Sequence, residues 1–169
     1  ILIEAAVQNA VEINCSVMGN YDLRASVLEQ PITWQEFLTY EEKYMRSEGA
    51  AGMKGAERQI PAPIAEELTQ KIRQLAIKAF RAVDGRGIAR IDFLLHKESD
   101  TVYLNEINTM PGSLAFYLWQ EEGMTPADVV DELIRLAQEA HTEKRKTVYN
   151  YKTGLLAHAA ARGLKGLKK

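Results

Sequence analysis

The sequence predicts an α+β fold in which helices pack on an antiparallel-rich mixed sheet. Short apolar runs are separated by turns containing Gly, Asn or Asp, which is typical of closely connected strands. Two longer segments instead carry apolar residues at helical spacing. The two clearest strands, 87–96 and the run that begins at Thr101, are joined by a short polar turn, so we expect them to form an antiparallel hairpin.

The composition is that of an ordinary globular protein. Of the 169 residues, 46% are hydrophobic and 26% are charged. No apolar run approaches the roughly 18 residues of a membrane span. Cys15 is the single cysteine and lies among apolar residues, so an internal disulfide is excluded and we expect a buried thiol in a cytoplasmic protein.

The net charge of −2 conceals an uneven distribution of charge. Residues 144–169 contain eight Lys or Arg and no Asp or Glu, whereas the preceding 143 residues contain 13 basic and 23 acidic side chains. A basic tail can bind nucleic acid or a membrane surface. We favour a solvated or body-docked extension instead, and we expect neither nucleic acid nor a membrane among the partners.

The first half of the chain predicts three strands and a long loop. Residues 1–7 indicate a buried strand, and because chain ends usually lie at the surface, we expect the sequence to be part of a longer protein. Further strands are predicted over 11–18 and 24–28. Residues 31–59 are weakly periodic, so we expect a long loop with one helical turn near Trp34.

Three helices are predicted in the remaining sequence. Residues 64–83 carry one apolar stripe and end at Asp84-Gly85. Residues 126–140 follow Thr125, a good N-cap, and begin with a proline at the first helical position. A third, Ala-rich helix is expected over 154–162.

The hairpin carries the residues of greatest chemical interest. Side chains two apart on a strand share a face, so Arg90 lies with Asp92 and Glu106 lies with Asn108. A turn centred near Ser99 places Asp92 opposite Glu106. The same register places Arg90 opposite Asn108. Two opposed carboxylates repel each other, so this register predicts a cation between them.

An oxygen-only ligand set favours magnesium over zinc at this position. Arg90 adds a fixed positive charge suited to a phosphate or an oxyanion. The alternative is an ion-pair cluster on an exposed sheet face. The turn at Pro111-Gly112, directly after the second strand, favours the metal interpretation because its backbone N–H groups can face an anion.

Three segments together resemble the D-alanine–D-alanine ligases of the ATP-grasp superfamily. They are Gly87-Ile-Ala-Arg-Ile-Asp-Phe93, Leu104-Asn-Glu-Ile-Asn-Thr-Met-Pro-Gly112 and Phe37-Leu-Thr-Tyr-Glu-Glu-Lys-Tyr44. The resemblance covers about residues 1–140 and implies the C-terminal part of an ATP-grasp domain over 1–143, followed by a basic extension over 144–169 with a short helix. The family's N-terminal domain and the first half of the ATP-grasp module have no counterpart in this sequence.

The resemblance implies a role for each matching residue. Asp92, Glu106 and Asn108 would hold two Mg²⁺ ions, for which Mn²⁺ is a substitute. Arg90 and the Gly112 N–H would stabilise the tetrahedral oxyanion. The residues that would contact ATP, or belong to the loop that covers it, are Glu4, Val7, Glu12, Lys43, Tyr44, Leu104 and Asn105. Of these, Glu12 would bind the ribose hydroxyls, and Lys43 and Tyr44 would belong to a loop that closes over ATP.

One departure from the family pattern affects the second substrate. The family usually carries a serine a few residues after the Pro-Gly pair, and this serine holds the carboxylate of the second substrate. This chain has Tyr117 at about that position and Ser113 directly after Gly112. The sequence therefore does not distinguish D-alanine from D-lactate, D-serine or another small acceptor.

The implied activity is an ATP-dependent carboxylate–amine ligase. It would join two D-alanines through an acyl phosphate for peptidoglycan precursors, cell-wall biogenesis and cell shape. The expected partners are ATP, D-alanine, the N-terminal half of the same protein and a second copy in a homodimer. The alternatives are an ATP-grasp ligase with a different second substrate and a non-catalytic nucleotide-binding module. Residues 1–169 alone are expected to be inactive.

Overall fold

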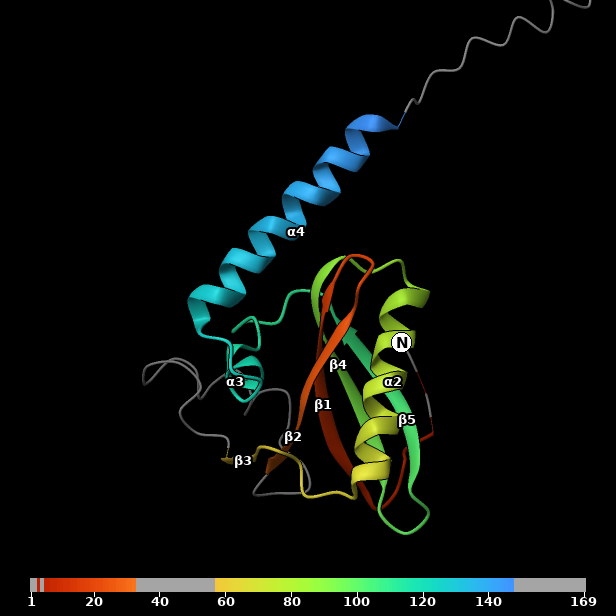
Figure 1. Cartoon of the computed structure of the whole chain (residues 1–169). Coiled ribbons are helices and arrows are strands. Elements are labelled where there is room, and N and C mark those ends of the chain that lie inside the picture. The colour runs from red at the N-terminus through yellow and green to blue at the C-terminus, as the bar shows by residue number, and fades with distance from the viewer. Residues whose placement is uncertain (1–2, 4, 33–56, 148–169) are drawn as a thin grey trace, which may run out of the picture.

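The computed structural model describes residues 3, 5–32 and 57–147 (Figure 1). Five strands form one sheet in the order β3-β2-β1-β4-β5, and every neighbouring pair is antiparallel. The strands are β1 (Ala10–Gly19), β2 (Arg24–Ile32), β3 (Glu57–Gln59), β4 (Gly87–His96) and β5 (Thr101–Asn108). The predicted α+β class is confirmed.

The helix α2 (Glu66–Ala82) covers one face of the sheet (Figure 1). Its buried residues Ile72, Ala76 and Phe80 pack against alternate residues of β1 and β4. The helix contributes apolar residues at helical spacing, and the strands contribute every second residue. They form one core because each element buries a single face. The ring of Phe80 also explains the glycine at position 85, three residues after the helix. A Cβ on Gly85 would lie 2.7 Å from this ring.

Two further helices pack at one end of the opposite face. They are α3 (Phe116–Gln120) and α4 (Pro126–Lys146). Their buried residues Trp119, Val129 and Leu136 form a second core with Met18 and Ile88 of the sheet. This core lies at the end where β1 finishes and β4 begins, so the middle of that face is left to polar side chains.

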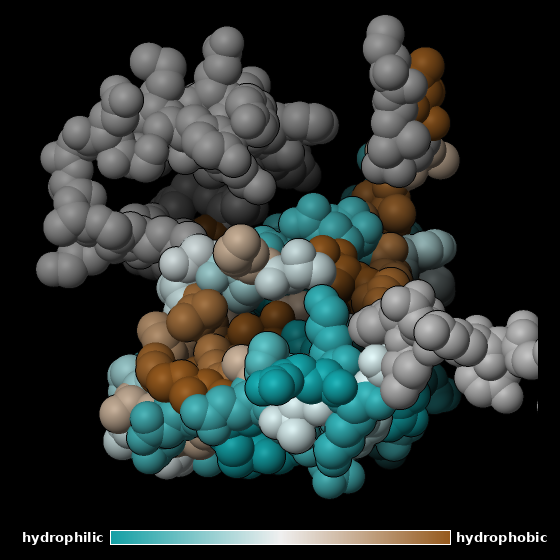
Figure 2. Space-filling view, turned by 90° about the horizontal axis from the view of Figure 1, so that it is seen from above, coloured by the Kyte–Doolittle hydropathy of each residue, from teal (hydrophilic) through white to brown (hydrophobic). Residues whose placement is uncertain are grey.

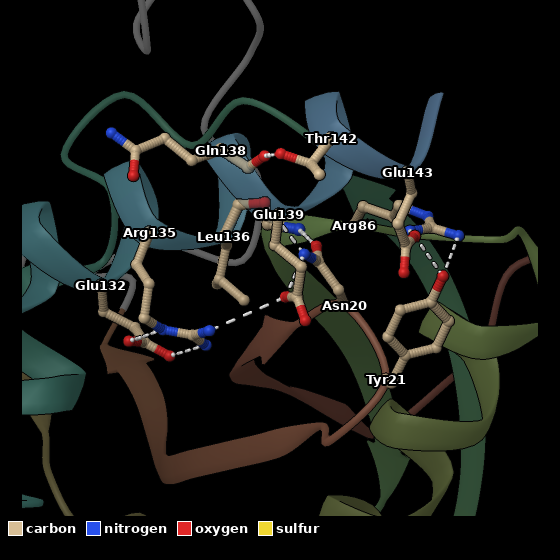
Figure 3. A network of polar contacts seen from close by, with 11 residues as sticks. Asn20, Tyr21, Arg86, Glu132, Arg135, Leu136, Gln138, Glu139, Thr142 and Glu143 are labelled. Atoms are coloured by element: carbon tan, nitrogen blue, oxygen red, sulfur yellow. Dashed lines mark hydrogen bonds and ion pairs between the residues drawn. The ribbon is translucent and has the colours of Figure 1, made fainter. Parts of the chain in front are cut away.

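The capping residues of α4 agree with the prediction, but the helix is longer. Thr125 and Asp128 form a reciprocal capping box, with Asp128 N–H donating to Thr125 Oγ1 at 3.2 Å. The helix runs six residues past the predicted end at Ala140 and through the boundary expected at residue 143. Figure 3 shows the reason: Asn20 and Tyr21, which follow β1, and Arg86, which precedes β4, contact the second half of α4, and an apolar pattern does not reveal these polar contacts.

Several expectations for local structure were wrong. Ile3 and residues 5–7 lie outside any strand, and Ile3 is 89% exposed. No strand within the described residues pairs with this segment, so its apolar run has no partner against which to be buried. Residues 57–59, expected in a loop, form β3, and β2 continues to Ile32. The expected helix at 154–162 and the turn near Trp34 lie outside the described residues.

The surface is mixed in character. Figure 2 shows hydrophilic regions interrupted by hydrophobic patches on the face seen from above. The large apolar side chains that remain exposed include Tyr103 and Leu104 on β5, Met110 after it, and Val130 and Ile134 on α4. Within the part of the chain that the structure describes, no helix is long and apolar enough to cross a membrane.

Candidate functional site

A row of polar residues crosses the sheet face opposite α2. Glu106 of β5 pairs with Asp92 of β4, Asp92 pairs with Asn14 of β1, and Asn14 pairs with Glu29 of β2. Residues paired across antiparallel strands point to the same face. The four side chains therefore lie side by side on one surface. The predicted register, with Asp92 opposite Glu106, is confirmed.

Arg90 and Asp92 form a two-bond ion pair on this face. Arg90 Nε and Nη2 each donate to a different carboxylate oxygen of Asp92, both at 2.7 Å. The Asp92 side chain is 3% exposed and that of Arg90 21%. The hydrogen bonds to Asp92 raise the pKa of Arg90 above its ordinary value, against the opposing effect of burial. The forked geometry satisfies a buried carboxylate while keeping its charge.

Glu106 lies beside this pair. Desolvation, and then the neighbouring Asp92 carboxylate, raise the pKa of Glu106, while Arg90 lowers it. The Glu12 carboxylate also raises the pKa of Glu106, so three carboxylates share this part of the face. A concentration of negative charge of this kind is stabilised by a cation.

The oxygen atoms available here fit a magnesium ion. Asp92 and Glu106 supply carboxylates from facing strands, and Asn108 supplies an amide oxygen that also accepts the Met110 N–H at 3.2 Å. Among the described residues, no group of three or more His, Cys, Asp or Glu is arranged to hold a metal. Magnesium commonly binds one or two carboxylates together with phosphate oxygens and water, so a small protein set suits it.

The loop after β5 contains Gly112, whose backbone N–H is the expected second donor to the oxyanion. Pro111 is buried and Gly112 is exposed, with open space where a Cβ would stand. Leu114 and Ala115 follow with φ of +50° and +51°, a left-handed conformation that costs a non-glycine residue about 1 kcal/mol or more. The hydrogen bond from Leu114 N–H to Pro111 O, at 2.9 Å, closes the turn.

The residues expected to bind ATP lie in different parts of the chain, and some lie outside the described residues. Glu12 lies on the same face as Asp92, and Val7 is half-buried just before β1. Asn105 lies at the irregularity in the β4–β5 pairing, between the pairs Phe93–Leu104 and Asp92–Glu106. Glu4, Lys43 and Tyr44 lie outside the described residues.

Leu104 does not join the site. It pairs with Phe93, a core residue of the α2 face, and lines a hollow with Leu75 and Ala79 of α2. The extra residue at Asn105 interrupts the alternation, so Glu106 shares the face of Asp92 while Leu104, two residues earlier, shares the face of Phe93. Leu104 and Glu106 are therefore on opposite faces of β5.

One cluster was missed in the sequence. Glu29, 2% exposed, accepts a hydrogen bond from Tyr117 of α3 at 2.5 Å and lies 3.4 Å from Arg58 of β3. These residues come from three separate elements, so no local spacing connects them. The one sequence signal was the position of Glu29 directly after an apolar strand.

Comparison with known proteins gives the family. The model described as D-ala D-ala ligase C-terminus matches residues 1–135. The chain belongs to this family. A D-alanine–D-alanine ligase of Thermoanaerobacter sp. (strain X514) is 42% identical over 148 residues, which cover 85% of this chain and 39% of that protein.

Solved structures of the family share the fold. The D-alanine–D-alanine ligase of Coxiella burnetii superposes with a TM-score of 0.66 at 26% identity, covering 94% of this chain and 38% of that chain. The VanG D-Ala:D-Ser ligase of Enterococcus faecalis superposes with a TM-score of 0.63 at 25% identity, covering 77% and 37%. The chain thus spans about two fifths of the length of its relatives.

Proposed function

We propose that this chain forms one wall of the active site of an ATP-dependent D-alanine–D-alanine ligase. The observation that carries the proposal is the facing pair Asp92–Glu106 with Arg90 beside it, in a chain of this family. Acyl transfer through a phosphorylated carboxylate requires a site for ATP and metal ions next to a cation that stabilises an oxyanion. The polar face supplies both kinds of group.

Asp92, Glu106 and Asn108 are the residues that would hold two Mg²⁺ ions. Magnesium in this position neutralises the charge of the phosphoryl group during transfer from ATP to the carboxylate of the first D-alanine. Glu12 lies on the same face, where its carboxylate can accept hydrogen bonds from the ribose hydroxyls. Glu4, Val7 and Asn105 are proposed to contact the adenine. Lys43 is proposed to reach the γ-phosphate, and Tyr44 to order the loop that covers the substrate. Leu104 is left out because it faces α2.

Arg90 and the Gly112 N–H are proposed to stabilise the second step. The amine nitrogen of the second D-alanine forms a bond to the acyl carbon, and the bond from that carbon to the phosphate oxygen breaks. Phosphate leaves with the electron pair, and the nitrogen loses a proton. The carbonyl oxygen carries negative charge between these events, and two fixed donors favour that state.

The setting of the reaction is also proposed. The product would supply peptidoglycan precursors in the cytoplasm, which agrees with a single buried thiol. The remainder of the ATP and substrate site would come from an N-terminal half of the same protein, and the intact enzyme would be a homodimer.

The decisive experiment measures ADP and phosphate release by the intact protein with a panel of amino acids. We expect release with D-alanine and not with L-amino acids. Inactivity with every D-amino acid would refute the proposed function. A second candidate, a ligase with a different acceptor, is favoured by Tyr117 at the position of the family's serine. The same panel, with D-serine and D-lactate as acceptors, tests it.

A further inference from the structure

A second guanidinium, that of Arg58, lies on the same sheet face as Arg90. Arg58 is on β3, at the opposite edge of the sheet from β5, which carries the proposed metal residues Glu106 and Asn108. Arg58 Nη1 lies 3.4 Å from Glu29 Oε2, and its guanidinium stacks over the ring of Tyr117, with 4.2 Å between its central carbon and the ring centroid. The Arg58 side chain is 24% exposed, whereas that of Glu29 is 3% exposed. Glu29 and Tyr117 hold one edge and one face of the guanidinium, and the exposed part can bind a ligand.

Glu29 is engaged from three sides. Besides Arg58, it accepts hydrogen bonds from the Tyr117 hydroxyl at 2.5 Å and from Asn14 Nδ2 at 3.3 Å. A carboxylate with this many donors is fully satisfied and rigid, so it serves to orient its neighbours. Tyr117 and Arg58 are therefore held in fixed positions by a group that itself does not face solvent.

Tyr117 lies against the Arg58 guanidinium and also feels the charge of Arg90. Burial and the bond to Glu29 raise the pKa of Tyr117, while Arg58 and Arg90 both lower it. Its hydroxyl therefore remains a neutral donor near pH 7, bonded to Glu29. In strand order across the sheet, Glu106 lies on β5, Asp92 and Arg90 lie on β4, and Arg58 lies on β3.

An unsatisfied acceptor lies beneath this cluster. Asn14 is 2% exposed, and its Oδ1 has no hydrogen-bond partner among the described residues. Its Nδ2 is directed to Glu29, so the oxygen is directed away from Glu29. Leaving a buried acceptor open costs about 1–3 kcal/mol. The site is therefore built for a donor that the described residues do not supply, such as a substrate N–H.

We propose that Arg58, held by Glu29 and Tyr117, binds the carboxylate of the second amino-acid substrate. The inference rests on the proposed ligase function. A guanidinium matches the planar geometry of a carboxylate, and the place of Arg58 beyond Arg90 separates this carboxylate from ATP. The amine of a substrate anchored there would have to reach the acyl carbon that Arg90 is proposed to hold. The acceptor is thus an amino acid with a free carboxylate.

The test is steady-state kinetics of the intact enzyme with Arg58→Ala, measuring the KM for the first and second substrate separately. Loss of a charged hydrogen bond predicts an increase of about 10- to 100-fold in the second KM, with the first KM and kcat within about threefold of wild type. D-alaninamide, which lacks the carboxylate, is the probe of the contact. Discrimination between D-alanine and D-alaninamide as acceptor should fall by the same factor as the second KM rises.

Further variants separate a binding role from a structural one. Arg58→Lys keeps the charge but loses the fork, so its second KM should lie between those of wild type and Arg58→Ala. Arg135→Ala removes an exposed arginine paired with Glu132 on α4 and should leave both KM values unchanged. If Arg58→Ala does not fold, the Arg58→Lys variant decides.

Three results overturn the proposal. An unchanged second KM in Arg58→Ala or Arg58→Lys removes the carboxylate contact while the ligase function stands. An equal loss with D-alanine and D-alaninamide assigns Arg58 a structural role. A wild-type enzyme that is inactive with every D-amino acid removes the proposed function and this inference with it.

Discussion

Replacing Asn20 is expected to release the second half of α4 from the sheet. Asn20 follows β1 and is 9% exposed. Its Nδ2 donates to Leu136 O at 2.9 Å and to Glu139 Oε2 at 2.8 Å, and its Oδ1 accepts the Gly87 N–H at 3.3 Å. Figure 3 shows this side chain reaching α4 beside the Tyr21–Arg86–Glu143 contacts.

The magnitude follows from these three bonds. A neutral hydrogen bond contributes about 1 kcal/mol net and one to a charged group about 1.5–3, so Asn20→Ala should lose on the order of 3 kcal/mol. If α4 opens locally, amide exchange over its second half should become on the order of 100-fold faster.

Hydrogen–deuterium exchange of the intact protein, followed by peptide over residues 126–146, measures this directly. Asn20→Asp is the sharper variant, because it keeps the shape but places a carboxylate oxygen against Leu136 O and the Glu139 carboxylate. It should accelerate exchange at least as much as Asn20→Ala. Arg135→Ala, which removes only exposed ion pairs, is the control. Exchange in both Asn20 variants within about threefold of this control would refute the reasoning.

Two other predictions concern the metal residues and the thiol. Glu106→Gln removes one of two facing carboxylates, so it should abolish ligation in the intact enzyme and weaken Mn²⁺ binding. Electron paramagnetic resonance measures the Mn²⁺ binding. An unchanged Mn²⁺ affinity would contradict the ligand assignment. Burial raises the pKa of Cys15 from 9.0 to about 12, so the folded protein should not react with a disulfide reagent at pH 8, whereas the unfolded protein should. The same shift implies that the contribution of Cys15 to stability is complete below pH 9 and decreases as the pH rises towards 12, because the unfolded thiol ionises first.

The hairpin could be predicted because its geometry is local. A short turn fixes the register of two adjacent strands, and alternation then places Asp92 opposite Glu106. The alternation failed at Asn105, where one extra residue interrupts the pairing. Nothing in the sequence marks that residue as a bulge, so alternation alone would place Leu104 with Glu106, whereas the structure places it with Phe93 on the α2 side.

The features that the sequence did not predict depend on contacts between residues far apart in the chain, or on the absence of a pairing partner. The helix α3 has five residues and follows a residue with positive φ, so it presents neither a cap nor a full apolar stripe. Glu29 and Tyr117 are 88 positions apart, and only the folded sheet brings them together. The apolar run at residues 1–7 was predicted as a strand from its pattern, but it has no pairing partner in the described part of the chain.

The two faces of this sheet show how one small domain combines stability and chemistry. The odd-numbered positions Ile13 and Cys15 of β1, with Ile91 and Phe93 of β4, pack against α2. Their even-numbered neighbours carry the polar row, because successive side chains on a strand point in opposite directions. The polar row and the α2 core are therefore built from different side chains of the same strands. The helices α3 and α4 close only the end of the polar face near Met18 and Ile88, and α3 delivers Tyr117 to Glu29 from there. The proposed metal residues then lie on β4 and β5 and Arg90 lies on β4, whereas Arg58, proposed for the acceptor, lies on β3 at the other edge of the sheet.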